Sequence, residues 1–185
     1  MLKRPLLAVL LFLLAFTFAG CGSSTSTFHA HGISFKYPHD WKQVEQDKVG
    51  ASNATARWME LVAPKSASLL DFVSVAEFHL KVSVITPTKL MALKPRVTDD
   101  LRNLVKKTGG KILRGPTSFT VGRLPALSYR IEAAAFGKKM TASRIVLAYR
   151  GHTQYVFNCQ RSLSGILASE IERGCNEAIT SFRLD

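Results

Sequence analysis

The sequence predicts an α+β domain built on an antiparallel sheet of about six or seven strands that is flanked by helices. Three features lead to this prediction. Apolar and polar residues alternate in several short segments, which is the period of a strand with one buried face. One segment in the middle of the chain has helix start and stop signals, and the last segment carries apolar residues at helical spacing.

The first half of the chain contributes four predicted strands. Residues 33–37 alternate apolar and polar side chains, and a proline-containing turn at 38–40 separates them from a strand that begins at Trp41. Residues 58–63 form a third strand, and residues 75–84 form a fourth in which every second position is apolar. This alternation predicts a sheet with one face in contact with water.

The second half contributes both helices. Thr98, followed by two acidic residues, predicts a helix start, and Gly109-Gly110 predicts its end. A closing helix is expected from about Ser169 to Ser181. The strands expected between the two helices are 117–121, 126–134, 139–149 and 153–160, with turns at 122–125, near Phe136-Gly137 and at Gly151-His152.

Residues 1–20 form a predicted export signal. Lys3 and Arg4 are followed by an almost wholly apolar run, which is shorter than the roughly 20 helical residues that span a bilayer, so a permanent transmembrane helix is the poorer interpretation. The sequence Phe-Ala-Gly-Cys at 18–21 resembles the lipobox of bacterial lipoproteins, in which the cysteine thiol receives diacylglycerol before cleavage. We therefore expect Cys21 to carry lipid at the mature N-terminus. The alternative is a plain signal peptide with a chance cysteine.

A lipid-bearing Cys21 would hold the protein on the outer face of the bacterial cell membrane, or on an outer membrane in a cell with two membranes. Each buried methylene contributes about 0.8 kcal/mol, so two or three acyl chains anchor durably. Residues 21–27 are small and polar after the cysteine, which predicts a flexible tether. Residues 28–185 then form a single domain of ordinary size.

The chain is strongly basic. Its formal charge is +12, and the leader's Lys3 and Arg4 account for two charges, so the mature chain carries 12 − 2 = +10. An exported and anchored protein meets anionic lipid headgroups and cell-wall polymers, so nucleic acid is not expected as a partner. Because the basic residues are scattered along the chain, a solvated surface without a specific role is the alternative.

Two cysteines remain once Cys21 is assigned to lipid. Cys159 ends a predicted strand, and Cys175 lies on the apolar face of the last predicted helix. An even pair outside the cytosol predicts a disulfide. The alternative is two buried free thiols, and the pair lacks the Cys-x-x-Cys spacing of a redox site.

The familiar catalytic and phosphate-binding motifs are absent from the sequence, which predicts a protein that is not an enzyme. An enzyme of unfamiliar type would need a pair of perturbed titratable groups in a cleft. His29 and His31 would share one face of a strand and could bind zinc or copper, with His39 or Asp40 as a third ligand. Two histidines at a domain edge are more often exposed or packed on the surface, so no metal or cofactor is predicted.

Four short motifs resemble those of PsbP-like domains, and they stand in the same order. They are Ile33-Ser34-Phe35-Lys36-Tyr37-Pro38-His39-Asp40-Trp41, Gly122-Arg123-Leu124-Pro125-Ala126, Tyr155-Val156-Phe157 and Ser181-Phe182. The resemblance covers residues 28–185 and implies an α/β/α sandwich around an antiparallel sheet. That fold occurs in an extrinsic subunit of photosystem II and in many bacterial lipoproteins of unknown role. The motifs are structural, so the photosynthetic role is not carried over.

The sequence therefore favours a non-catalytic lipoprotein that docks on an envelope protein or on an anionic cell-wall polymer, as PsbP-like proteins dock on larger assemblies. Such a protein needs a contiguous exposed apolar or basic patch. The alternative is a carrier of a small ligand or a metal ion, with its pocket between the sheet and a helix. A carrier needs a concave site lined by convergent polar groups.

Overall fold

A computed structural model of the chain describes residues 24–45, 56–84, 86–135 and 140–185. Nine strands and two helices occupy these ranges. In chain order they are β1 (Thr25–Ala30), β2 (Ile33–Pro38), β3 (Trp41–Gln43), β4 (Ala56–Pro64), β5 (Phe72–Val84), α1 (Pro87–Lys107), β6 (Lys111–Val121), β7 (Leu124–Ala134), β8 (Met140–Ser162), α2 (Ala168–Ser181) and β9 (Arg183–Leu184).

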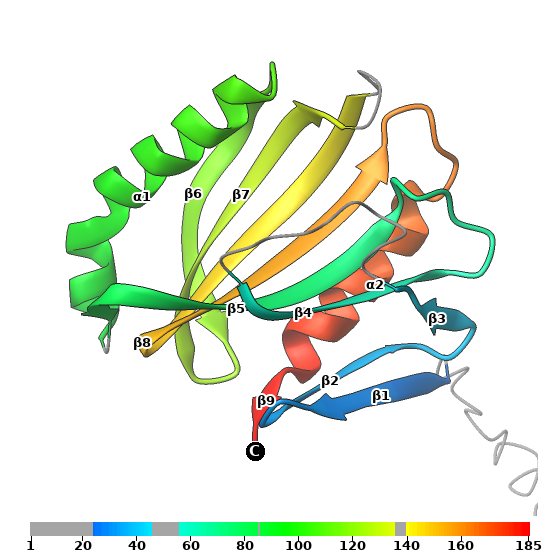
Figure 1. The fold of residues 1–185 in the computed structure, drawn as a ribbon, viewed down its shortest axis with the longest axis horizontal. Helices are drawn as coiled ribbons and strands as arrows, with labels where there is room; N and C mark the ends of the chain where they lie inside the picture. Colours follow the sequence, from blue (N-terminus) through cyan, green and yellow to red (C-terminus); the bar gives the residue numbers. More distant parts are fainter. Residues whose placement is uncertain (1–23, 46–55, 85, 136–139) are drawn as a thin grey trace, which may run out of the picture.

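The strands form two antiparallel sheets. The larger sheet has six strands in the order β3-β4-β5-β8-β7-β6, and the smaller has three in the order β1-β2-β9. Helix α1 packs on one face of the six-stranded sheet and α2 on the other (Figure 1). The predicted α+β class, with an antiparallel sheet flanked by helices, is confirmed.

Strand β8 supplies two neighbouring legs of the large sheet. Residues 140–148 pair with β7, and residues from Gly151 onward pair with β5. Gly151 has φ of 58°, a left-handed conformation that glycine adopts without a steric penalty. Figure 1 shows the chain reversing between the two legs. The reversal lies at the turn that the sequence predicts at Gly151 and His152.

The face that carries α2 is covered by this helix together with the three-stranded sheet. Helix α2 contacts β2, β5 and β8. Its buried residues recur at helical spacing, namely Ile171, Gly174, Cys175, Ala178 and Ile179. They share one core with alternate residues of β2, β5, β7 and β8. The predicted closing helix and its apolar face are therefore confirmed.

Trp41 and a disulfide hold α2 in place. A Cβ atom at position 174 would lie 2.2 Å from Trp41 Cη2, so only glycine allows the indole ring to rest on the helix. The indole Nε1 donates a hydrogen bond to Glu170 Oε1 at 3.1 Å. The predicted disulfide between Cys159 and Cys175 is present and joins β8 to α2, with a Cα–Cα distance of 5.7 Å.

The end of the chain closes the small sheet. The Lys36 backbone N–H donates a hydrogen bond to Ser181 Oγ at 2.7 Å, and β9 then pairs with β2. The ring of Phe182 packs against Tyr155 and Phe157, with centroid distances of 5.3 and 5.2 Å. The Tyr-Val-Phe and Ser-Phe motifs of the sequence therefore meet in one aromatic cluster.

Helix α1 begins at Pro87, and the predicted start at Thr98 is wrong. Thr86 is the N-cap, since its hydroxyl accepts a hydrogen bond from the Lys89 N–H at 3.2 Å, and a proline fits the first helical turn. Pro95 lies inside the helix, and Thr98 Oγ1 donates to the Lys94 carbonyl at 2.8 Å. The predicted end is confirmed, because α1 ends at Lys107 and Gly109 has φ of 69°.

The folded domain also begins earlier than predicted. Strand β1 starts at Thr25, and residues 25–27, expected to belong to the tether, pair with residues 36–38 of β2. The leader at 1–20, Cys21 and the hairpin expected near Phe136-Gly137 lie outside the described residues. Within the described ranges, no helix combines the length and the apolar composition that crossing a membrane requires.

We expect Gly174→Ala to lower the free energy of unfolding by about 1–3 kcal/mol, because the added methyl group meets the Trp41 ring in a filled core. Urea denaturation of the two proteins measures this difference. Arg173→Ala, at the exposed neighbouring position, is the control and should stay within about 0.5 kcal/mol of the wild type. Equal stability of Gly174→Ala and the wild type would contradict the packing of Trp41 on α2.

Candidate functional site

Helix α1 covers only part of the second face of the large sheet. It packs mainly on β6 and β7, and Figure 1 shows it beside β6 at one side of the molecule. Of its 21 residues, only Leu90 and Val105 are buried. The apolar stripe of the helix is therefore incompletely covered.

A groove with a volume of about 920 Å³ lies between α1 and the sheet. Its helix wall consists of Leu90, Leu93, Val97, Leu101 and Leu104, which recur at intervals of three and four residues. Its floor is formed by alternate residues of the strands, including Met59, Phe72, Ala76, Phe78, Leu80, Ile145, Leu147 and Val156. Leu104 is 62% exposed and Val82 is 45% exposed, so apolar surface at the groove remains open to solvent. Exposed and clustered apolar side chains of this kind mark binding sites.

Polar groups lie at two places on the floor. Gln154 Nε2 donates a hydrogen bond to the Tyr149 hydroxyl at 2.9 Å. The sheet register places Asn158 opposite Ser74, and both residues line the groove. The Asn158 Oδ1 atom is buried and accepts no hydrogen bond from any described residue. This acceptor could take a hydrogen bond from a bound ligand.

Charged groups line the groove as well. Lys81, Arg96 and Asp100 are exposed, and among the described lining residues they carry two positive charges and one negative charge. The groove therefore combines an apolar interior with a mainly positive set of side chains exposed to solvent. An amphipathic ligand has this division of apolar and polar parts.

The titratable groups of this face suit binding better than proton transfer. Burial raises the pKa of Tyr149, although the hydrogen bond from Gln154 acts in the opposite direction. Burial also raises the pKa of Tyr129, whose hydroxyl lies 3.0 Å from Thr98 Oγ1. Both phenols therefore stay protonated at neutral pH and act as hydrogen-bonding groups. Asp100 is the single carboxylate among the described lining residues, so these residues do not supply the carboxylate pair of an acid–base catalyst.

Comparison with known proteins was made by sequence and by structure. No protein-family model matches the chain, and no curated protein matches its sequence. Solved structures do match. The cyanobacterial PsbP (CyanoP) of Synechocystis sp. PCC 6803 gives a TM-score of 0.55 at 13% identity, over 91% of this chain and 98% of that chain. The chain has a PsbP-like fold.

Two further structures share this PsbP-like fold. LpqN of Mycobacterium tuberculosis, described as involved in cell envelope biogenesis, gives a TM-score of 0.52 at 15% identity, over 87% of this chain and 90% of that chain. A protein from Bacteroides thetaiotaomicron VPI-5482 gives a TM-score of 0.54 at 11% identity, over 86% of this chain. This chain spans about half, 48%, of the length of that Bacteroides protein. At these identities the likeness establishes the fold alone.

The histidines suggested as metal ligands do not converge in the PsbP-like fold. Strand β1 ends at Ala30, and His31 has φ of 58° in the following turn, so His29 and His31 do not share a strand face. His29 Nε2 lies 3.1 Å from Asp185 Oδ2, while His31 stacks on Trp58 with a centroid distance of 4.9 Å.

The third suggested ligand is also engaged elsewhere. His39 Nδ1 lies 3.1 Å from Ser26 Oγ, and Asp40 is exposed. Within the described ranges, no group of three His, Cys, Asp or Glu side chains is placed to hold a metal ion. The metal-carrier alternative therefore has no assembled site among the residues that the sequence singled out.

The sequence placed a carrier's pocket between the sheet and a helix, but it did not identify the residues that line the groove. Leu90, Leu93 and Val97 continue the apolar spacing of Leu101 and Leu104 through Pro95, and this spacing is the signal that could have found the helix wall. The polar floor carries no local motif, because Tyr149 meets Gln154 across the turn of β8, and Asn158 faces Ser74 only through the pairing of β8 with β5.

Asn158→Leu is expected to raise the free energy of unfolding by about 1 kcal/mol, because it replaces a buried acceptor that lacks a partner among the described residues with an apolar side chain of similar size. Gln154→Leu on the same strand removes a donor that is hydrogen-bonded, so it is expected to lower stability by about 1 kcal/mol. Thermal and urea denaturation of both variants show whether each substitution raises or lowers the free energy of unfolding. If Asn158→Leu lost as much stability as Gln154→Leu, this would contradict the claim that Asn158 Oδ1 lacks a hydrogen-bond donor in the folded protein.

Proposed function

We propose that the chain is an exported, non-catalytic binding module of the bacterial cell envelope, anchored through lipid on Cys21. The leader at 1–20 and the lipobox-like residues at 18–21 support export and anchoring. The fold supports an envelope role, since LpqN, which is described as involved in cell envelope biogenesis, has the same architecture. Strand β1 starts at Thr25, four positions after Cys21, so lipid on Cys21 would hold the domain close to the membrane surface.

The observation that carries the binding role is the groove under α1. Its volume of about 920 Å³ lies at the upper end of the range of about 300–1,000 Å³ that is typical of small-molecule sites. The interior is apolar, and a few polar groups are placed on its floor. This combination fits the apolar chain of an amphipathic small molecule, such as a lipid taken from the membrane to which the protein is anchored.

The polar part of such a ligand has partners on the floor of the groove and among its solvent-exposed side chains. A hydroxyl or amide donor could reach Asn158 Oδ1, which has no described donor. An anionic head group would be attracted by Lys81 and Arg96. The geometry thus favours the small-ligand carrier that the sequence offered as its alternative, with a lipid-like ligand in place of a metal ion.

Docking on an envelope protein or an anionic polymer is the second candidate function. It requires a contiguous basic or apolar patch, and arginines gather beside α2 on the opposite face of the sheet. Ligand binding under α1 and docking beside α2 would use different faces, so one protein can perform both.

Photocrosslinking in intact cells tests the groove. Leu104 lines the groove and is 62% exposed, so its replacement by p-benzoylphenylalanine should leave the fold intact. After irradiation, mass spectrometry of the purified protein is expected to find a small-molecule adduct at position 104. Met91 lies on the same helix, is 47% exposed and does not line the groove, so the same replacement there is the control.

Equal adducts at positions 104 and 91, or no small-molecule adduct at 104, would contradict ligand binding in the groove. The N-terminal peptide from the same cells tests the anchor. It is expected to carry acyl chains on Cys21, and an unmodified cysteine would contradict the anchor while leaving the groove result unaffected.

A further inference from the structure

A second groove lies on the opposite face of the sheet, between the β6–β7 hairpin and the C-terminal part of α2. Its volume is about 870 Å³. Three arginines line it from three different elements, namely Arg123 in the β6–β7 turn, Arg144 on β8 and Arg183 on β9. Among the described lining residues there is no carboxylate. All the charged side chains among the described lining residues of this groove are therefore positive.

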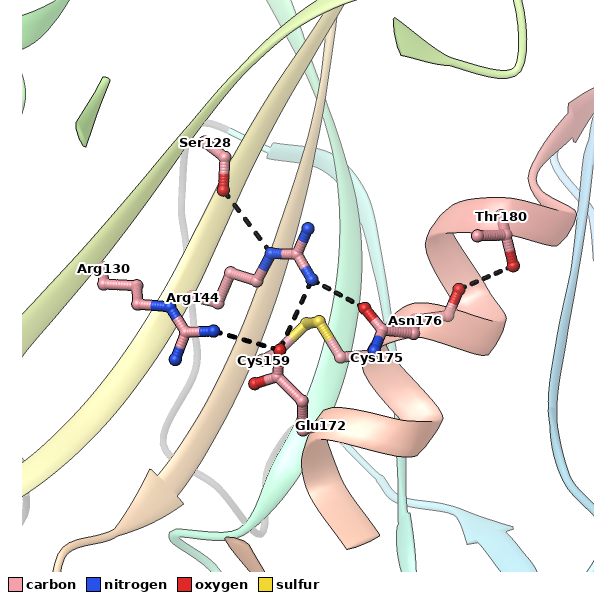
Figure 2. Close-up of polar contacts among 8 residues, drawn as sticks. All are labelled: Ser128, Arg130, Arg144, Cys159, Glu172, Cys175, Asn176 and Thr180. Atoms are coloured by element: carbon pink, nitrogen blue, oxygen red, sulfur yellow. Dashed lines mark hydrogen bonds and ion pairs between the residues drawn. A yellow bond between two sulfur atoms is a disulfide. The ribbon is translucent and has the colours of Figure 1, made fainter. Parts of the chain in front are cut away.

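Arg144 is held in a fixed orientation. Its Nη1 donates a hydrogen bond to Asn176 Oδ1 at 2.7 Å, and its Nε lies 3.5 Å from Ser128 Oγ (Figure 2). The side chain is 21% exposed. Asn176 follows Cys175 directly, so the disulfide to Cys159 fixes the helix that presents this amide. A guanidinium that is already oriented loses little side-chain entropy when it binds an anion.

The positive charge at Arg144 is only partly neutralised. Arg144 lies directly opposite Arg130 in the β7–β8 register, an arrangement that is destabilising for like charges. Both guanidinium groups approach the same Glu172 Oε1 atom, at 3.2 Å from Arg130 and 3.7 Å from Arg144 (Figure 2). One carboxylate shared by two arginines leaves a net positive charge, which a bound anion would compensate.

Arg183 and Arg123 extend this charge to the end of α2. Arg183 Nη1 donates to the backbone carbonyls of Thr180 and Phe182, at 3.2 and 2.7 Å, and thereby satisfies groups at the helix C-terminus. Arg123 is exposed in the neighbouring turn. From Glu172 to its last residue, Ser181, α2 rises by roughly 14 Å at 1.5 Å per residue, and Arg183 lies two residues beyond that end. The arginines therefore form a positive strip along the helix rather than a single point charge.

We infer that this arginine groove binds successive phosphate groups of a linear polyanion. The inference rests on the docking role proposed above and is independent of ligand binding under α1. The planar guanidinium group matches the geometry of phosphate oxygens and binds them through paired hydrogen bonds. The groove is as large as sites for drug-sized molecules, which exceeds what one phosphate ion fills. A chain with repeated phosphates would engage several arginines of the strip at once.

The test uses the full-length mature protein in nanodiscs of phosphatidylcholine, whose headgroups carry no net charge. Isothermal titration calorimetry compares linear polyphosphate of defined length with inorganic phosphate at equal phosphate concentration. The site variant is Arg123→Gln/Arg144→Gln/Arg183→Gln. If the triple variant fails to fold, Arg123→Gln/Arg183→Gln retains the hydrogen bonds of Arg144. The control is Arg102→Gln/Lys106→Gln/Lys107→Gln, which removes three positive charges from α1 on the opposite face.

The wild type is expected to bind polyphosphate at least tenfold more tightly than inorganic phosphate. The site variants should lose at least tenfold in polyphosphate affinity, whereas the control should change by less than threefold. Equal losses in the site and control variants would overturn the inference, because the effect would then come from net charge alone. Equal affinity for polyphosphate and inorganic phosphate would also overturn it. The crosslink at position 104 involves none of these arginines, so the two proposals can fail separately.

Discussion

The attachment of α2 to the six-stranded sheet is the constraint on which the rest of the structure depends. Trp41 rests on Gly174, and the neighbouring Cys175 is bonded to Cys159. These two contacts fix both the position and the rotation of the helix about its axis. The helix in turn directs Phe182 into the aromatic cluster and leads β9 to its place beside β2. The same rotation turns Glu172 and Asn176 toward the arginines of β7 and β8.

This arrangement makes the two faces of the large sheet unequal. Helix α2 and the three-stranded sheet together bury one face, while α1 alone covers the other and packs mainly on β6 and β7. A single helix has one apolar stripe about 100° wide and cannot cover a sheet of this width. The uncovered apolar surface of β5 and β8 becomes the floor of the groove. The fold thus leaves an apolar groove on one face of the sheet and a basic groove on the other.

Much of the fold could be predicted from the sequence, because local patterns determine it. The alternation of apolar residues predicted the strands, and the apolar face around Cys175 predicted α2. The even pair of cysteines in an exported protein predicted the disulfide. The start of α1 could not be found in this way, since Thr98 and the two acidic residues after it imitate a helix start inside the helix. The lining residues of the two grooves could not be predicted, because Asn158, Arg123 and Arg144 acquire their neighbours only through the long-range order of the strands. The His29–His31 spacing predicted two histidines on one strand face, and this prediction is wrong because the strand ends at Ala30, between the two residues.

The central claim is that the groove under α1 is a ligand site and not a packing defect. A crystal structure of the protein purified from its own cells, without added ligand, tests this claim most directly. We predict elongated electron density between α1 and the strands β5 and β8, with a polar atom near Asn158 Oδ1. A helix α1 that lies directly on β5 and β8, with its leucines filling the space and no density between them, would contradict the account.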